Sequence, residues 1–223
     1  MSDNVRLIEV KENILDDNEK VAAALRARLK EEKTFLVNLM ASPGAGKTST
    51  VIQTTARLKE AFNIGVLEAD IDSMVDAEKV AATGITAIQM RTGGFCHLDA
   101  SMVGDGLDAI GSQDFDLILL ENVGNLVCPA EFDTGSALNA MILSVPEGDD
   151  KPLKYPLMFS VCEVVLINKI DTCEHFDFDR ARFEEGVKKV NPSCTLFDIS
   201  CRTGEGIDAW VAWLKERTKA HNA

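Results

Sequence analysis

The sequence predicts an α/β fold, in which a mostly parallel sheet carries helices on both faces. Seven short apolar runs typical of buried strands recur along the chain. Most of them are separated by stretches long enough to form a helix. Strands and helices that alternate in this way form βαβ units, whose crossover helices cover both faces of a parallel sheet. At 223 residues, the chain has the length of one globular domain.

The elements follow one another in a regular order. Residues 16–32 are expected to form a leading amphipathic helix, because apolar side chains recur at helical spacing among charges, at Val21, Ala24, Leu25 and Leu29. We expect residues 1–33 to be an N-terminal region packed on the domain through this helix, and residues 34–223 to be the domain itself. The expected strands are residues 35–40, 65–68, 87–90, 117–120, 140–145, 164–167 and 196–199.

Two further helices and one loop complete this description. A helix at 48–61 follows the first strand, and a helix at 206–219 closes the chain, with Ile207, Trp210, Val211 and Leu214 facing inward. Residues 146–156 are expected to be the one long irregular loop. The carboxyl ends of parallel strands form the ligand-binding edge in such folds, so the polar residues after each strand are the candidates for function.

Composition excludes several classes of function. The formal net charge is −13, and no basic cluster is present, so neither a nucleic acid nor a membrane is expected as a partner. The chain has no apolar run of about 18 residues and no secretory signal pattern, and we expect a cytoplasmic protein. In that reducing compartment, the six cysteines are expected to be free thiols or metal ligands rather than disulfides.

The stretch Ala41-Ser-Pro-Gly-Ala-Gly-Lys-Thr48 lies between the first strand and its helix. Glycines there let backbone N–H groups turn toward phosphates, the lysine reaches the outer phosphates, and the threonine hydroxyl holds Mg²⁺. The alternative is a glycine-rich turn with a chance Lys-Thr pair, and Ala41 departs from the usual glycine. The motif predicts a P-loop NTPase, in which the phosphates contact Gly44, Ala45, Gly46, Lys47, Thr48 and Ser49.

The motif Asn168-Lys169-Ile-Asp171 follows the sixth expected strand and indicates guanine. The carboxylate of Asp171 can accept hydrogen bonds from both the ring N–H and the exocyclic amine of guanine, which adenine does not offer. A solvated turn with a helix-capping aspartate is the alternative. The segment Ser200, Cys201 and Arg202, after the last strand, resembles the loop that backs the base. Residues 34–223 are therefore expected to be a single P-loop GTPase domain that binds GTP and GDP.

Hydrolysis requires Mg²⁺ and a sensor of the γ-phosphate. Glu121 and Gly124 have the spacing of the acid and the glycine in the switch that contacts the γ-phosphate, with Glu in place of the usual Asp. Asp70, which ends the second strand, is the other candidate ligand, while Asp72 and Asp76 lie in the same acidic loop. We expect Lys47, Asp70 and Glu121 to be catalytic, and Thr48, Asp70 and Glu121 to hold Mg²⁺.

A second group of residues suits a softer metal. Cys96 and His97 are adjacent after a strand and a glycine pair, and Cys128 lies four residues after Gly124. Thiolate and imidazole bind Ni²⁺ or Zn²⁺, although a lone Cys-His pair is more often structural. A ligand at position 128 would move with the γ-phosphate sensor. Cys96 and Cys128 from two subunits would together supply four sulfurs across a two-fold axis.

The chain resembles the HypB family of hydrogenase nickel-incorporation GTPases from the phosphate loop onward. The resemblance is carried by the segments 41–48, 92–100, 121–129, 151–156 and 168–171, of which 121–129 and 151–156 are not required of GTPases in general. It implies a SIMIBI-class GTPase that dimerises with GTP and delivers nickel to the [NiFe]-hydrogenase large-subunit precursor, together with other maturation factors. It also implies a Ni²⁺ or Zn²⁺ site at the dimer interface, using Cys96, His97 and Cys128.

Residues 1–40 contain no Cys and no His, so the nickel-binding cysteine cluster and histidine-rich tract of some family members are absent from this stretch. Only the metal site of the GTPase domain is therefore expected. Two alternatives remain open: a urease-type nickel-insertion GTPase, and a non-catalytic GTP-bound metal-binding scaffold. The segment Glu121-Asn-Val-Gly124 stands where the urease family has Ser-Gly-Gly-Asp, which favours hydrogenase.

Overall fold

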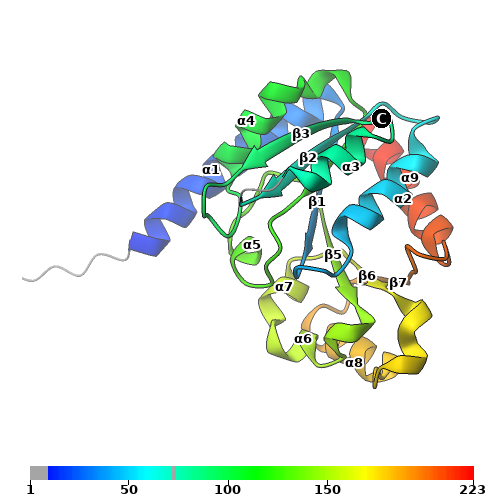
Figure 1. Ribbon diagram of the computed structural model, residues 1–223. Helices are drawn as coiled ribbons and strands as arrows, with labels where there is room; N and C mark the ends of the chain where they lie inside the picture. The colour runs from blue at the N-terminus through cyan, green and yellow to red at the C-terminus, as the bar shows by residue number, and fades with distance from the viewer. Residues whose placement is uncertain (1–9, 72–73) are drawn as a thin grey trace, which may run out of the picture.

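The computed structural model describes residues 10–71 and 74–223, and its centre is a seven-stranded sheet (Figure 1). All strands are parallel, in the order β3-β2-β4-β1-β5-β6-β7. Each strand overlaps one of the seven predicted apolar runs, with bounds that differ by a few residues, and the predicted fold class is confirmed. The strands are β1 (Phe35–Ala41), β2 (Ile64–Asp70), β3 (Thr86–Arg91), β4 (Leu117–Glu121), β5 (Leu138–Ser144), β6 (Val164–Asn168) and β7 (Thr195–Asp198).

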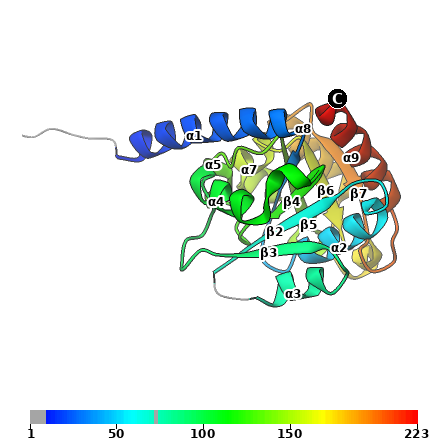
Figure 2. The same cartoon turned by 90° about the horizontal axis from the view of Figure 1, so that it is seen from above.

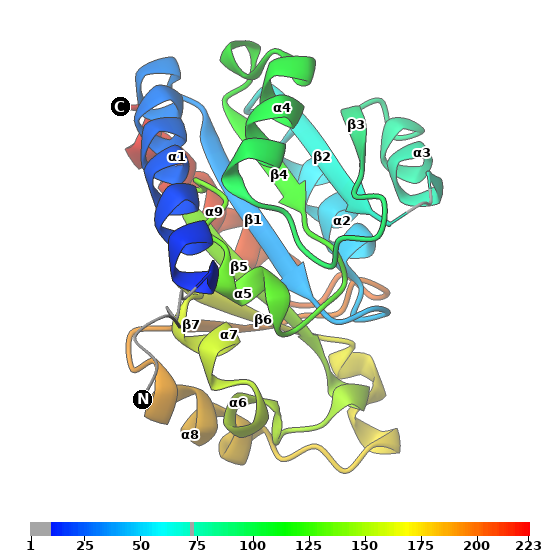
Figure 3. The same ribbon diagram turned by 90° about the vertical axis from the view of Figure 1, so that its left-hand side faces the viewer.

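Helices cover both faces of the sheet (Figures 2 and 3). One face carries α2 (Lys47–Leu58), α3 (Val75–Ala81) and α9 (Ile207–Asn222). The other face carries α1 (Val10–Glu32) and α4 (Ala100–Ile110) at one end, and α7 (Pro156–Ser160) and α8 (Arg180–Val190) at the other. The short helices α5 (Cys128–Glu131) and α6 (Lys151–Lys154) lie in the connections. Within the described ranges, no helix is long and apolar enough to cross a membrane.

The central strand β1 shows why the layers form. All seven of its side chains are buried, and alternate residues point to opposite faces of a strand. Val37 and Leu39 join the apolar cluster under α2 and α9, whereas Leu36 and Met40 join two separate clusters on the other face. Asn38 lies between those two clusters and is only 2% exposed, so a polar layer divides the core on that face.

Two local expectations are wrong. The leading helix buries Asn18, Ala22, Leu25 and Leu29, whereas Val21 is 44% exposed and Ala24 is also exposed. The buried face of this helix therefore includes a polar residue, Asn18, which a hydropathy pattern does not predict to be buried. Residues 146–156 do not form an irregular loop, because they include the end of a 3₁₀ turn at Val145–Glu147, all of α6 and the start of α7. The side chains of Ser144 and Glu147 form a capping box that starts the turn.

The closing helix agrees with the expected pattern. Ile207, Trp210, Val211 and Leu214 are buried, and the indole N–H of Trp210 donates to the Thr54 hydroxyl at 2.9 Å. This hydrogen bond ties α9 to the helix that follows the phosphate loop.

Candidate functional site

The phosphate loop joins the end of β1 to the start of α2. Gly44 has a φ of 78° and Gly46 a φ of 103°, both in the left-handed region that glycine adopts without strain. Ala41 is the last residue of β1 and is extended, which explains why the usual glycine is not needed there. A Cβ on Gly46 would lie 2.3 Å from Nδ2 of Asn168, so the loop and the segment after β6 are in close contact.

A cavity of about 560 Å³ opens above this loop at the carboxyl ends of the strands. Its walls include Lys47, Thr48, Asp70, Glu121 and Gly124, which brings the expected catalytic and Mg²⁺-binding residues together. The Thr48 hydroxyl donates to Oε1 of Glu121 at 3.0 Å.

The acidic loop after β2 supplies one described carboxylate to this cavity, that of Asp76. This carboxylate pairs with Nζ of Lys79 at 2.8 Å. Asp72 lies outside the described residues. Of the carboxylates considered for Mg²⁺, Asp70 and Glu121 therefore remain the two at the ends of adjacent buried strands.

Glu68 is a carboxyl group of this cavity that the sequence analysis did not select. It lies opposite Glu121 in the register of β2 and β4, and the two side chains are only 2% and 4% exposed. Each has one buried oxygen without a hydrogen-bond partner among the described residues, Oε1 of Glu68 and Oε2 of Glu121. Burial and the neighbouring Glu121 raise the pKa of Glu68 to about 10, so at neutral pH the Glu68 carboxyl keeps its proton and donates a hydrogen bond to Glu121.

Burial also raises the pKa of Glu121, while the hydrogen bond from Glu68, Lys47 and Thr48 counteract it. A charged residue inside an apolar strand run was the available signal for Glu68. The buried oxygen of Glu121, beside the Thr48 hydroxyl, fits a divalent cation, because hard cations prefer oxygen ligands.

A second pocket, where the sequence predicts the guanine base, lies beside the phosphate loop and has a volume of about 310 Å³. Asn168 donates to the carbonyl of Ala45 at 2.9 Å and accepts from the N–H of Cys201 at 3.2 Å, so it joins the two loops. Lys169, with a φ of 64°, donates to the carbonyl of Gly44 at 2.7 Å. These contacts connect the segment after β6 and the segment after β7 directly to the phosphate loop.

Asp171 is held at the opening of this pocket. Its Oδ1 accepts from the Ser200 hydroxyl at 2.6 Å, and Nη1 of Arg202 lies 3.7 Å from Oδ2. Arg202 is mostly exposed, so this ion pair contributes little. The side chains of Asp171, Cys201 and Arg202 all line the pocket, as the expected recognition of guanine requires.

Gly124 lies against the phosphate loop. A Cβ at this position would be 3.1 Å from Cγ of Pro43 and 3.3 Å from Nζ of Lys47. A larger side chain would therefore displace the Lys47 side chain. The segment that starts at Glu121 thus contacts the phosphate loop before it continues to Cys128.

Cys96, His97 and Cys128 form a compact group. Their ligand atoms all lie within 4.8 Å of one another, and Sγ of Cys96 is 3.7 Å from Nδ1 of His97. Cys96 and His97 follow β3, and Cys128 begins α5 after β4. The three ligands come from a single chain, and two thiols with one imidazole suit Ni²⁺ or Zn²⁺.

The surroundings of this group affect its protonation and its shape. The Cys128 thiol and burial raise the pKa of Cys96, and burial lowers the pKa of His97, which keeps the imidazole neutral. A metal that binds here would displace the thiol protons. The ring of Phe132 stacks on His97 with the centroids 3.8 Å apart, a contact that the sequence motifs did not indicate.

The chain matches the family model described as the CobW/HypB/UreG nucleotide-binding domain over residues 35–198. It is 42% identical to the hydrogenase maturation factor HypB of Escherichia coli (strain K12) over 210 residues, which cover 94% of this chain and 72% of that protein. It is 39% identical to the hydrogenase/urease maturation factor HypB of Helicobacter hepaticus, with 98% of this chain and 91% of that protein covered.

Two solved structures are similar over most of the chain. HypB from Archaeoglobus fulgidus has a TM-score of 0.85 at 36% identity and covers 92% of this chain and 100% of its own. HypB from Helicobacter pylori in complex with nickel has a TM-score of 0.85 at 37% identity, with 92% and 97% covered. The signal recognition particle 54 kDa protein of Aeropyrum pernix, at 13% identity and a TM-score of 0.57, covers 98% of this chain and 58% of its own and shares the fold.

Proposed function

The chain belongs to the CobW/HypB/UreG family and, within it, to the hydrogenase maturation factors HypB, and from this premise we propose a Mg²⁺-dependent GTPase that carries nickel or zinc. Its proposed role is to promote nickel insertion into [NiFe]-hydrogenase. The nucleotide state would control both dimerisation and metal release. The partners of this proposal are a second copy of the chain, other maturation factors and the hydrogenase large-subunit precursor, all in the cytoplasm.

The residues around the large cavity support the GTPase part of the proposal. The backbone of the phosphate loop and Nζ of Lys47 would bind the β- and γ-phosphates, and Asp171 would select guanine. Thr48, Asp70 and Glu121 would hold Mg²⁺, which neutralises charge that develops on the phosphates during transfer. Thr48 and the neutral Glu68 both donate to Glu121, and these bonds keep its carboxylate turned toward the cavity.

One observation carries the coupling of nucleotide and metal. Gly124 packs against Lys47 and Pro43, and four residues later Cys128 meets Cys96 and His97. A γ-phosphate that attracts Lys47 would therefore move the segment that supplies a metal ligand. Cys128 would shift relative to the Cys96–His97 pair, and the metal affinity would change with it.

The GTPase part is tested by phosphate release from GTP with Mg²⁺. Lys47→Ala should abolish release, because the outer phosphates lose their cation, whereas Lys59→Ala, at an exposed position after α2, should leave it unchanged. Absence of release from the unaltered protein under all metal conditions would favour a GTP-bound scaffold over an enzyme.

The metal part is tested by calorimetric titration of Ni²⁺ and Zn²⁺. Cys96→Ala and Cys128→Ala should each abolish tight binding and leave GDP binding intact, while Cys173→Ala, at an exposed thiol, should change neither. The affinities with GDP and with a slowly hydrolysed GTP analogue should differ. Equal affinities in the two states would contradict the coupling, and metal binding that survives both cysteine changes would place the site elsewhere.

A further inference from the structure

The two segments that supply the proposed metal ligands come from different parts of the sheet. Cys96 and His97 lie between β3 and α4, whereas Cys128 begins α5 after β4. The ring stacking of Phe132 on His97 is one contact between the segments. A site with three ligands on two segments keeps its geometry only if something fixes the distance between them.

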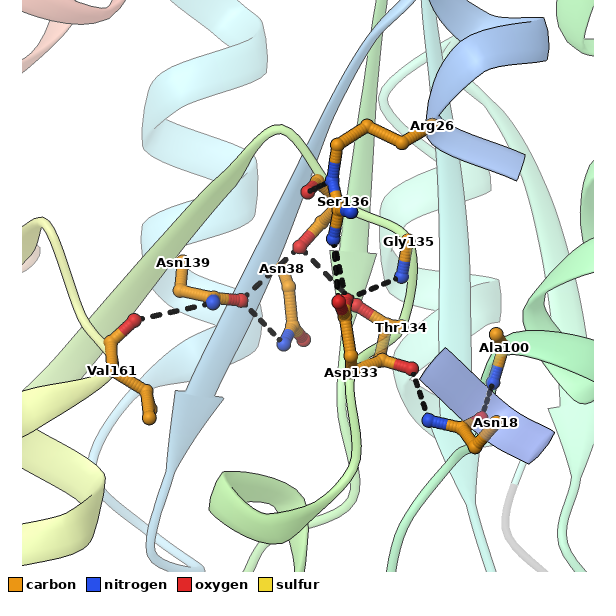
Figure 4. A network of polar contacts seen from close by, with 10 residues as sticks. All are labelled: Asn18, Arg26, Asn38, Ala100, Asp133, Thr134, Gly135, Ser136, Asn139 and Val161. Atoms are coloured by element: carbon orange, nitrogen blue, oxygen red, sulfur yellow. Dashed lines mark hydrogen bonds and ion pairs between the residues drawn. The ribbon is translucent and has the colours of Figure 1, made fainter. Parts of the chain in front are cut away.

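Asn18, on the N-terminal helix α1, contacts both segments at once. Its Oδ1 accepts from the backbone N–H of Ala100, the first residue of α4, at 2.8 Å. Its Nδ2 donates to the backbone carbonyl of Asp133 at 2.8 Å. Ala100 lies three residues after His97, and Asp133 follows Phe132 directly. The side chain of Asn18 therefore bridges the two segments, as Figure 4 shows.

A buried asparagine that uses both ends of its amide is well suited to this role. Asn18 is 9% exposed, and its loss would leave the buried N–H of Ala100 and the part-buried carbonyl of Asp133 without their hydrogen-bond partner. For packing alone, an apolar residue at position 18 would suffice, as Ala22 and Leu25 do on the same buried face of α1. The hydrogen bonds to Ala100 and Asp133 explain why a polar residue, Asn18, lies on the buried face of α1.

Arg26 holds the same loop at a second point. Its Nη2 lies 2.7 Å and 2.6 Å from the two carboxylate oxygens of Asp133, and its Nε donates to the carbonyl of Ser136 at 3.1 Å (Figure 4). Gly135, with a φ of 75°, lies so close to α1 that a Cβ there would be 2.9 Å from Cδ2 of Leu25. The loop after Cys128 is thus pressed against α1 along two turns of the helix.

We infer that α1 is part of the metal site and that Asn18 is a positioning residue, supported by Arg26. The helix presets the separation between Cys128 and the Cys96–His97 pair, so that the three ligand atoms converge before a metal arrives. This inference deepens the proposed metal site and rests on it. Removing such outer support from a metal site lowers its affinity about 10- to 100-fold.

The test is the Ni²⁺ affinity of the full chain with GDP, measured by competition with a chromogenic chelator. Asn18→Leu keeps the size of the side chain and removes both hydrogen bonds, and it should weaken Ni²⁺ binding about tenfold or more. The thiolate-to-nickel absorption bands should shift, because the ligands no longer converge in the same geometry. GDP affinity should stay unchanged, since neither Asn18 nor its two hydrogen-bond partners, Ala100 and Asp133, line the nucleotide cavity.

A matched pair on α1 separates positioning from general destabilisation. Arg26→Met loses the contacts to Asp133 and should weaken Ni²⁺ binding several-fold. Arg28→Met is the same substitution two residues later and loses contacts of Arg28 to Asp108, in the last turn of α4, and to Ser112, in the 3₁₀ turn that follows it. It should loosen α1 without changing the Ni²⁺ affinity. The pair also decides the question if Asn18→Leu fails to fold.

The outcomes distinguish this inference from the proposed function. If the unaltered protein binds no Ni²⁺ through Cys96 and Cys128, the proposed metal site fails and the role of Asn18 fails with it. If the cysteine-dependent site is present and the Asn18 and Arg26 variants bind Ni²⁺ as tightly as the unaltered protein, only the positioning role is overturned. Equal losses in the Arg26 and Arg28 variants would also overturn it, because they would indicate destabilisation alone.

Discussion

Replacing Glu68 with glutamine should make the protein more stable at neutral and alkaline pH. Glu68 is buried against Glu121, and burial raises its pKa from 4.5 to about 10. The folded protein therefore holds a proton on Glu68 that the unfolded chain releases above pH 4.5. A glutamine has nothing to release and can still donate to Glu121 through its amide.

The sign and the size follow from linkage. For an acid whose pKa is raised by folding, the stabilising contribution is complete below the unfolded pKa and is lost as the pH rises toward the folded pKa. Each pH unit in that window costs about 1.4 kcal/mol. The free energy of unfolding of Glu68→Gln, relative to the unaltered protein, should therefore rise by about 3 kcal/mol between pH 5.5 and pH 7.5.

Urea denaturation at pH 5.5, 6.5 and 7.5, without nucleotide or divalent metal, measures this difference. Glu60→Gln is the matched control, because it makes the same change at an exposed position and should leave the pH dependence unaltered. A constant difference between Glu68→Gln and the unaltered protein at all three pH values would refute the reasoning. It would show that Glu68 is already ionised in the folded state.

Two further predictions concern the edge of the sheet that binds the nucleotide. Gly206→Ala should lower the free energy of unfolding by about 3 kcal/mol or more, because the added Cβ would lie 1.9 Å from the carbonyl oxygen of Asp198. Gly204→Ala, also at a positive φ but with no backbone atom among its nearest neighbours, should cost only about 1–2 kcal/mol, and equal costs in urea denaturation would contradict the clash. Asp171→Ala should weaken GDP binding about 100-fold or more and leave ADP binding unchanged in titrations with fluorescent analogues. An equal loss for both nucleotides would mean that Asp171 does not recognise guanine.

The strands and the ligand-binding edge could be predicted from the sequence because they depend on local patterns. A fully buried strand such as β1 is apolar at every position but Asn38, and the glycines, lysine and threonine of a phosphate loop lie within a few residues of one another in the chain. The helix α1 was harder to orient. The helical pattern of its apolar residues fits more than one buried face. That Asn18 is buried and Val21 is exposed depends on the partners of Asn18, which are distant in the sequence.

The sequence by itself determined the fold class, the phosphate loop, the expected guanine motif and the types of metal ligand. Each of these depends on a pattern of residues that are close together in the chain. Only the tertiary structure decided which distant groups meet. It paired Glu68 with Glu121 across two strands, brought Cys128 to Cys96 and His97, and placed Asn18 between the segments that carry them. The physical reason is that pKa shifts, metal geometry and buried hydrogen bonds depend on separations in space, which strand order and helix packing set.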